Sequence, residues 1–570
     1  MNPKMLKIIP ARYRKRMVVV TATIFMRAML NFIGLAVLIP VLALIIDAGN
    51  IAANPWLDRI YTAIGFTDTR MFAAAVCAAV VAIIIVKNLL ALLLFRVERN
   101  FVFDLYGYFS RRLYITYHDR GLSFIKHHNS ALLVRNVGIP MRFIMGVLMP
   151  AAAIICDASL FVILFAAMMW FSPVTAVTAV FVFLPSVALY YLLVRRRLET
   201  CGRQEEEVTR SRSRCVNETF RGYADMEINN AFPHMLDRFD DYQRLIIEMR
   251  RRRETINKLP GLFIETALAV GMSAIVIVCA GGESSQAGMM FGIFAVAALR
   301  LLPSIRSIVG NWTVIKYNRY TVDILAEADE HAPEPERDDR RMTFSDRITV
   351  ENLSFRFDDG RDDRAIFTNL NLTIRKGELL GIRGISGAGK TTLFNLLLGF
   401  YKPTAGRIAV DGTTLDDTTR RRWQNNIGYV SQNVFISDTT FIENVALGVP
   451  RDEIDRDRAA RSLEAARLGD FIASLPAGMD AAIGECGCRL SGGQRQRIGI
   501  ARALYKQADV LFFDEATSSL DNRTEQSINQ SVRELSAGNR ELTIVVIAHR
   551  ESSLDCCDRI ITIGEDDTRI

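Results

Sequence analysis

Residues 384–391 read Gly-Ile-Ser-Gly-Ala-Gly-Lys-Thr, the full G-x-x-x-x-G-K-T pattern of a phosphate loop. Glycines let backbone N–H groups close around phosphates, while Lys390 supplies a point charge and the Thr391 hydroxyl is placed for Mg²⁺. The flanking runs, 378–383 and 392–398, have the strand and helix patterns that this loop requires. The residues expected at the nucleotide are Gly384, Ser386, Gly387, Gly389, Lys390, Thr391 and Thr392. The motif predicts an ATP site with Mg²⁺.

A second constellation is the carboxylate pair Asp514 and Glu515, which ends the apolar run 510–513. This run is too continuous for an amphipathic strand, so we expect it in the centre of a parallel sheet. Asp514 is placed to hold Mg²⁺ and Glu515 to polarise the water that attacks the γ-phosphate. An Asp-Glu pair alone is common at a strand end. Downstream of a phosphate loop, the pair predicts ATP hydrolysis.

Residues 348–570 resemble the nucleotide-binding domain of ABC (ATP-binding cassette) transporters. Leu490-Ser491-Gly492-Gly493-Gln494 is similar to the family signature, and further matches are Gln432 to the Q-loop, Asp521 to the D-loop, His549 to the switch histidine and Phe357 to an adenine-stacking tyrosine. The resemblance implies catalytic roles for Glu515, His549 and Gln432, a metal site of Thr391, Gln432 and Asp514, and nucleotide contacts from Phe357, Ser491, Gly493, Gln494 and Asp521. A phenyl ring at Phe357 keeps the π face for stacking.

The signature glycines have a physical role, because residues 491–493 open a helix whose N-terminus offers N–H groups and a positive dipole end to an anion. In the family, that anion is the γ-phosphate held by the phosphate loop of the other subunit. This chain carries one cassette, so the resemblance implies a second copy, as a homodimer. One departure is Cys486-Gly487-Cys488, which lacks the second Cys/His pair of a metal site; we expect all nine cysteines to be free thiols.

The first half of the chain has the composition of a membrane protein, and half of all residues are hydrophobic. Long apolar runs occupy 17–46, 72–95, 143–171, 174–194, 260–280 and 286–302. About 20 residues cross a bilayer core, so these runs predict six spans. The expected fold is an all-α six-helix transmembrane domain, similar to type IV ABC exporters, at 1–326, a linker at 327–346 and an α/β P-loop cassette at 347–570.

Arginine is concentrated in segments 96–142 and 195–258, whereas 47–71 carries only Arg59 and Arg70. The positive-inside rule therefore places both termini and the cassette in the cytoplasm, and the protein in the inner membrane. The net charge of +7 reflects these flanks, so we expect no nucleic-acid partner. In the half-exporters that this layout resembles, short coupling helices end the cytoplasmic extensions, and we expect them near 123–132 and 222–233.

The sequence matches that bear on the substrate are less specific than those that identify the cassette. Residues 31–40, 54–61 and 298–304 resemble lipid-linked oligosaccharide flippases, which implies a lipid-linked saccharide or similar amphipathic lipid. A peptide or modified peptide, a drug or other small hydrophobe, and an ATP-gated channel stay open as alternatives; import is disfavoured, since importers usually place the two domains on separate chains.

Charged residues within the apolar runs and close to their ends are Arg27, Lys87, Asp157, Glu265 and Arg300. A charge at the bilayer centre is costly, so such residues pair with one another or face a water-filled cavity. Two interpretations follow. Either Lys87 and Arg300 reach toward the interface while Asp157 pairs with a neighbouring helix, or Arg27 and Arg300 line a central cavity and attract an anionic head group.

Overall fold

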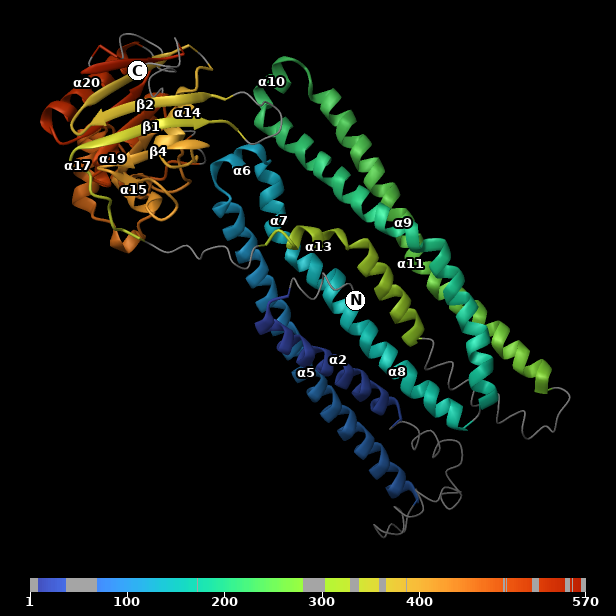
Figure 1. Cartoon of the computed structure of the whole chain (residues 1–570). Helices are drawn as coiled ribbons and strands as arrows, with labels where there is room; N and C mark the ends of the chain where they lie inside the picture. The colour runs from blue at the N-terminus through green and yellow to red at the C-terminus, as the bar shows by residue number, and fades with distance from the viewer. Residues whose placement is uncertain are drawn as a thin grey trace. The chain divides into compact units, whose positions relative to one another are not determined.

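The computed structural model describes residues 9–36, 69–171, 173–279, 303–328, 338–357, 365–385, 387–484, 487, 490–514, 522–548, 554–555 and 557–564. The chain divides into two compact units, Met1–Glu334 and Pro335–Ile570. The first unit is helical where it is described, and the second holds all the described strands (Figure 1). A helical unit followed by an α/β cassette confirms the predicted fold class.

The predicted spans fall on long helices. These are α2 (Ala11–Ala36), α5 (Thr69–Asp119), α8 (Met149–Phe171), α9 (Pro173–Arg221) and α11 (Phe232–Cys279), with a further helix over 303–317. Two stretches, Ala74–Asp119 and Ser130–Ile163, are long and apolar enough to cross a membrane by length and composition. The last third of the first predicted span, 37–46, and the run 286–302 lie outside the described residues.

Short helices occur at both positions where coupling helices are expected. Helix α6 (Gly121–His127) follows α5, and α10 (Tyr223–Ile228) joins the long helices α9 and α11, which run side by side (Figure 1). Helix α7 (Ser130–Phe143) continues through a π-helical turn, η2 (Ile144–Leu148), into α8. The last described helix of this unit is α13 (Tyr320–Leu325).

Two adjacent buried carboxylates on α9 connect the helices of the first unit. Glu206 forms ion pairs with Arg135 at 2.6 Å and with Arg142 at 3.1 Å, and both arginines belong to α7. Glu205 accepts from Arg250 of α11 at 3.0 Å. A buried carboxylate is costly unless it is paired, so these contacts fasten α7 and α11 to α9.

The cassette contains a five-stranded parallel sheet in the order β6-β7-β8-β3-β9. Its strands are β3 (Leu379–Gly384), β6 (Ile427–Val430), β7 (Val510–Asp514), β8 (Thr543–Ile547) and β9 (Arg559–Ile563). Strand β7 lies between two neighbours and is buried at every residue, as its apolar run predicts. A second, antiparallel sheet in the order β2-β1-β4-β5 is built from β1 (Arg347–Phe355), β2 (Phe367–Arg375), β4 (Ala405–Val410) and β5 (Thr413–Thr414).

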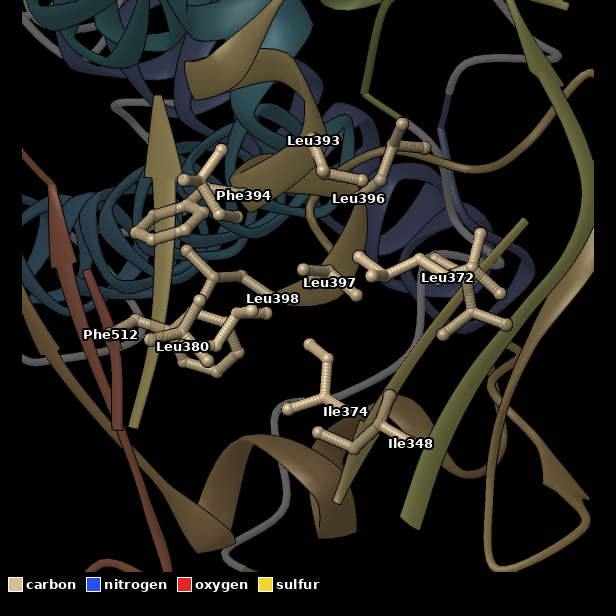
Figure 2. Close-up of a cluster of buried hydrophobic side chains, with 14 of the residues drawn as sticks. Ile348, Leu372, Ile374, Leu380, Leu393, Phe394, Leu396, Leu397, Leu398 and Phe512 are labelled. Carbon is tan, nitrogen blue, oxygen red and sulfur yellow. The ribbon is translucent and has the colours of Figure 1, made fainter. Parts of the chain in front are cut away.

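Helix α14 (Lys390–Leu397) contributes to the core that unites the two sheets (Figure 2). Ile348 and Ile374 enter this core from the antiparallel sheet, and Phe394 of α14 meets Phe512 of β7 edge to face at 5.2 Å. The remaining described helices are α15 (Arg420–Asn426), α16 (Phe441–Val445), η3 (Arg451–Glu453), α17 (Arg456–Ala465), α18 (Gly469–Ala473), η4 (Gly478–Asp480), α19 (Gly492–Tyr505) and α20 (Asn522–Gly538). Tight packing around α14 fixes the position of its first turn.

The end of the predicted linker is attached to the cassette. The Met342 N–H donates to Asn426 Oδ1 at 3.0 Å, and Asn426 Nδ2 returns a bond to the Met342 carbonyl at 2.8 Å. Arg341 donates to the Lys506 carbonyl at 2.6 Å. From Arg341 onward, the chain is therefore part of the packed structure of the cassette.

Candidate nucleotide site

The phosphate loop connects β3 to α14, and its glycines are required by close approaches. Gly389 has φ +93°, and a Cβ there would lie 2.7 Å from Ile366 Cγ2 and 2.8 Å from Phe367 Cζ. A Cβ on Gly384 would lie 2.5 Å from the Ile563 carbonyl oxygen of β9. Only glycine fits both places, so the loop can follow the tight path that turns its N–H groups toward a phosphate.

Lys390 is 5% exposed and lies inside this loop. Its Nζ donates to the Gly384 carbonyl at 2.8 Å and to the Ile385 carbonyl at 3.0 Å. Thr391 is exposed and Thr392 is half-buried on the first turn of α14. The ammonium, the hydroxyls and the helix N-terminus together form a site suited to an anion.

Thr391 and Asp514 lie at the same end of the α14–β7 contact. Phe394 packs on Phe512 at 5.2 Å, Thr391 lies one turn before Phe394, and Asp514 lies two residues after Phe512 on the same face of the strand. Strands β3 and β7 run in the same direction, because each is parallel to β8. Helix α14 begins after the C-terminal end of β3. Thr391 in its first turn and Asp514 at the C-terminal end of β7 therefore lie at the same edge of the sheet. A hydroxyl and a carboxylate oxygen are ligands that Mg²⁺ prefers, so this pair fits the ion.

Tyr429 of β6 also reaches Asp514. Its hydroxyl donates to Asp514 Oδ2 at 3.3 Å. Burial and the neighbouring Asp514 charge raise the pKa of Tyr429, so the phenol stays a donor. No role for this tyrosine follows from the sequence, because its contact with Asp514 depends on β6 lying next to β7. Its position three residues before Gln432, in an apolar strand, is the available signal.

The expected adenine platform belongs to an aromatic cluster. Phe357 is half-buried and meets Phe355 edge to face at 5.1 Å and Tyr401 at 5.5 Å, while Phe355 and Tyr401 stack at 5.6 Å. Burial raises the pKa of Tyr401, which keeps the ring neutral. Tyr401 is a further aromatic residue of this cluster. It could not be assigned to the adenine platform from sequence, because it follows α14 and lies far along the chain from Phe357, which follows β1. The cluster holds Phe357 in place as a stacking surface.

Gln432 is exposed at the start of the loop between β6 and α16. Arg502 of α19 donates to the Phe435 carbonyl at 3.1 Å and to the Asn444 carbonyl at 2.9 Å. Burial lowers the pKa of Arg502 to about 10. The Asn444 side chain in turn accepts from the Ser437 N–H at 2.9 Å. The loop after Gln432 is thus attached to the helix that carries the signature.

Signature residues Ser491 and Gln494 bond to each other. Ser491 Oγ accepts from the Gln494 N–H at 3.2 Å, and Gln494 Oε1 accepts from the Ser491 N–H at 2.8 Å, which is a capping box at the start of α19. Ser491 is exposed and Gly493 is buried. The Gln494 side chain therefore shapes the N-terminal end of α19.

Ser386, Glu515, Asp521 and His549 lie outside the described residues. The structure brings together the phosphate loop, Thr391 and Asp514 on one edge of the parallel sheet. Gln432 follows β6, whose Val430 pairs with Phe513 of β7 in parallel, so it leaves the sheet at this same edge, and the signature lies at the start of α19.

Residues 367–518 match the family described as ABC transporter. An ATP-dependent lipid A-core flippase of Burkholderia orbicola (strain AU 1054) is 30% identical to this chain over 447 residues, which cover 78% of this chain and 74% of that protein. The chain belongs to the ABC transporter half-exporters. A second flippase of the same description, from Burkholderia pseudomallei (strain 1710b), is 29% identical over 516 residues, 90% of this chain and 85% of that protein.

The solved structure of a bacterial Atm1-family ABC exporter with ATP bound has the same fold as this half-exporter. Its TM-score is 0.70 at 23% sequence identity, and the match covers 98% of this chain and 94% of that one. With the cassette motifs, these findings confirm the predicted class: this half-exporter is a membrane ATPase that couples ATP hydrolysis to transport.

Two of the charges found in the apolar runs, Arg27 and Asp157, have partners in the structure. Arg27 lies 3.0 Å from Glu98, whose side chain is 7% exposed, and Asp157 accepts from Ser307 of the 303–317 helix. The Asp157 contact agrees with a bond to a neighbouring helix. Lys87 is half-buried, Glu265 is exposed, and Arg300 lies outside the described residues.

Proposed function

We propose that two copies of this half-exporter form an ATP-driven flippase for an amphipathic lipid, with a lipid-linked saccharide as the leading substrate class. The observation that carries the proposal is the similarity to lipid A-core flippases over 90% of this chain, because that length includes the helical unit where a substrate would bind. A peptide or a small hydrophobe is the second candidate class. We place the protein in the inner membrane with both termini and the cassette in the cytoplasm.

For the ATP site we propose that adenine stacks on Phe357 and that the phosphates lie in the loop 384–392. Thr391, Asp514 and Gln432 would hold Mg²⁺, which neutralises phosphate charge when bound. Glu515 would accept a proton from the attacking water, and His549 would contact the γ-phosphate. These roles rest on motif positions and, for Thr391 and Asp514, on their common edge of the sheet.

For the dimer we propose that each ATP lies between the phosphate loop of one copy and Ser491, Gly493 and Asp521 of the other. The capped N-terminus of α19 supports this role, since its capping box leaves the helix end ordered and accessible. Ser491 itself is exposed, as contact with a partner's nucleotide requires.

The test is ATP hydrolysis by the purified full chain in liposomes, with lipid-linked saccharides, glycolipids, peptides and small hydrophobes added in turn. We expect saturable stimulation by a lipid-linked saccharide or glycolipid, together with its ATP-dependent movement between leaflets. The Glu515→Gln variant gives the background. Stimulation and movement of peptides alone would contradict the lipid proposal and favour the peptide class.

A further inference from the structure

Gln496 is a buried polar residue of α19, the helix that begins at the signature, and it is 3% exposed. Its amide oxygen, Oε1, accepts no hydrogen bond from the part of the chain that the structure describes. A buried amide oxygen without a donor lowers the stability of a fold, because it has lost its hydrogen bonds to water. Native proteins pair nearly all such atoms, so this one indicates a role other than packing.

The face of α19 that carries Gln496 lies against β6. A Cβ on Gly428 of β6 would lie 2.5 Å from Ala503 Cβ. A Cβ on Gly499 would lie 3.2 Å from Val430 Cγ1, two residues further along the strand. Two residues forward along β6 therefore correspond to four residues back along α19, about 6 to 7 Å in each element. Gln496 precedes Gly499 by three residues, so it belongs to the same helix face.

The same register brings Gln496 to the loop that carries Gln432. Two residues beyond Val430 the chain reaches Gln432, and the next turn of α19 contains Gln496. The loop then returns to the helix, since a Cβ on Gly499 would also lie 3.1 Å from Val434 Cγ2. Gln496 is therefore the buried polar residue of α19 that lies nearest in register to Gln432.

We propose that Gln496 is a positioning residue of the ATP site, and that its amide oxygen accepts a hydrogen bond from the side-chain amide of Gln432. This inference rests on the role in Mg²⁺ binding proposed above for Gln432. An amide binds a cation through its carbonyl oxygen, which leaves its NH₂ group as a donor. An acceptor at that NH₂ group fixes which way the amide is turned. Arg502 of the same helix holds the far end of the loop at the Phe435 carbonyl, 3.1 Å away.

The experiment compares the purified full-length wild-type protein with Gln496→Met, which keeps the length of the side chain and removes the acceptor. We expect the Mg²⁺ concentration for half-maximal ATP hydrolysis to rise about tenfold, as for loss of a group that orients a metal ligand. The midpoint of thermal unfolding without nucleotide should not fall, because the variant removes a buried acceptor that has no donor.

Gln424→Met is the matched control. It removes a hydrogen bond from Gln424 Nε2 to the Leu398 carbonyl at 3.2 Å. This variant should lower the midpoint of thermal unfolding and leave the Mg²⁺ requirement unchanged. A double-mutant cycle with Gln432→Ala completes the test. If Gln496 acts through Gln432, Gln496→Met should have no further effect on the Mg²⁺ requirement in the Gln432→Ala background.

Three results would overturn the inference. If Gln432→Ala raises the Mg²⁺ requirement and Gln496→Met does not, Gln496 has no positioning role, and the role of Gln432 stands. If Gln432→Ala keeps the wild-type requirement, the metal-binding role of Gln432 is wrong, and this inference with it. If Gln496→Met fails to fold or unfolds at a lower temperature, with effects that add to those of Gln432→Ala, Gln496 serves packing.

Discussion

The Tyr429 hydroxyl donates to Asp514 Oδ2 at 3.3 Å, and this bond joins β6 to the carboxylate proposed to hold Mg²⁺. The two residues are 85 positions apart in the chain but lie on neighbouring strands. A donor at one oxygen of a metal-binding carboxylate fixes its orientation.

Tyr429→Phe should therefore raise the Mg²⁺ concentration needed for half-maximal ATP hydrolysis by about tenfold, as for loss of a bond that supports a metal ligand. A Mg²⁺ titration at constant ATP measures this. The matched control is Tyr505→Phe, which removes a hydroxyl bonded to the Asp455 N–H at 3.1 Å, away from Asp514. An unchanged Mg²⁺ requirement in Tyr429→Phe would show that the bond does not position the carboxylate.

Glu515→Gln should lower ATP turnover by a factor on the order of 10² to 10⁴ and leave ATP binding intact, because it removes only the base. Single-turnover hydrolysis and nucleotide-binding assays on the purified protein measure both quantities. Lys390→Ala should instead weaken ATP binding, since its charge also acts on the ground state. Hydrolysis near the wild-type rate in Glu515→Gln would remove Glu515 from the mechanism.

Composite sites predict complementation between two inactive chains. Lys390→Ala damages the phosphate loop, and Ser491→Arg disrupts the capping box and the anion position. In a mixed dimer, one site carries both defects and the other carries neither. Hydrolysis should therefore appear only when the two chains are co-expressed and purified by two different tags. Full activity of either variant alone would rule out sharing between copies.

Because Arg27 pairs with Glu98, we expect a substitution of Arg27 to lower the stability of the protein and not its response to substrate. Arg27→Gln should lower stability by about 3 kcal/mol, because buried Glu98 loses the cation that lies 3.0 Å from it. The double variant Arg27→Gln with Glu98→Gln should recover part of this loss of stability. A double-mutant cycle measured by thermal unfolding tests this. A loss of substrate-stimulated hydrolysis with unchanged stability would support the other interpretation, an arginine that attracts an anionic head group.

Asp411 predicts a pH-dependent contribution to cassette stability. It accepts from the N–H groups of Asp346 at 3.0 Å and Arg347 at 2.9 Å and from the Ser345 hydroxyl at 2.9 Å. Burial alone raises its pKa, but these hydrogen bonds outweigh burial and hold the pKa below the ordinary 3.8. The contribution is therefore present above pH 3.8 and is lost as the pH falls through the lower folded pKa.

Asp411→Asn should accordingly reduce the free energy of unfolding by about 1.5 to 3 kcal/mol at neutral pH. The difference from wild type should shrink in acid, when the wild-type carboxyl is also neutral. Thermal unfolding across this pH range measures it. Asp417→Asn is the control, since it breaks an exposed pair with Lys402 that contributes about 1 kcal/mol or less. Equal losses in both variants at neutral pH would contradict the role given to Asp411.

The predictable part of the site is local in sequence. The spacing of Gly384, Gly389 and Lys390 fixes a loop whose close approaches the structure shows, and the apolar run before Asp514 predicts a central strand, which β7 is. The helical unit and the α/β cassette also follow from hydropathy and motifs.

The unpredicted part depends on which elements become neighbours. Tyr429 reaches Asp514 because the sheet order places β6 beside β7, and Tyr401 joins Phe357 because the end of α14 returns to β1. Arg27 meets Glu98 only through the packing of α2 on α5. The hydrophobic pattern of one segment does not indicate which distant segment it will pack against, so contacts between such segments cannot be read from it.

The Lys390 ammonium bonds to the Gly384 and Ile385 carbonyls of its own loop. The Lys390 ammonium therefore supports the loop from within, through the backbone of the loop itself. Product departure does not require the loop to collapse, and the next ATP does not have to rebuild it. Successive turnovers can then begin from the same receptive shape, so the waiting time between them need not include local refolding.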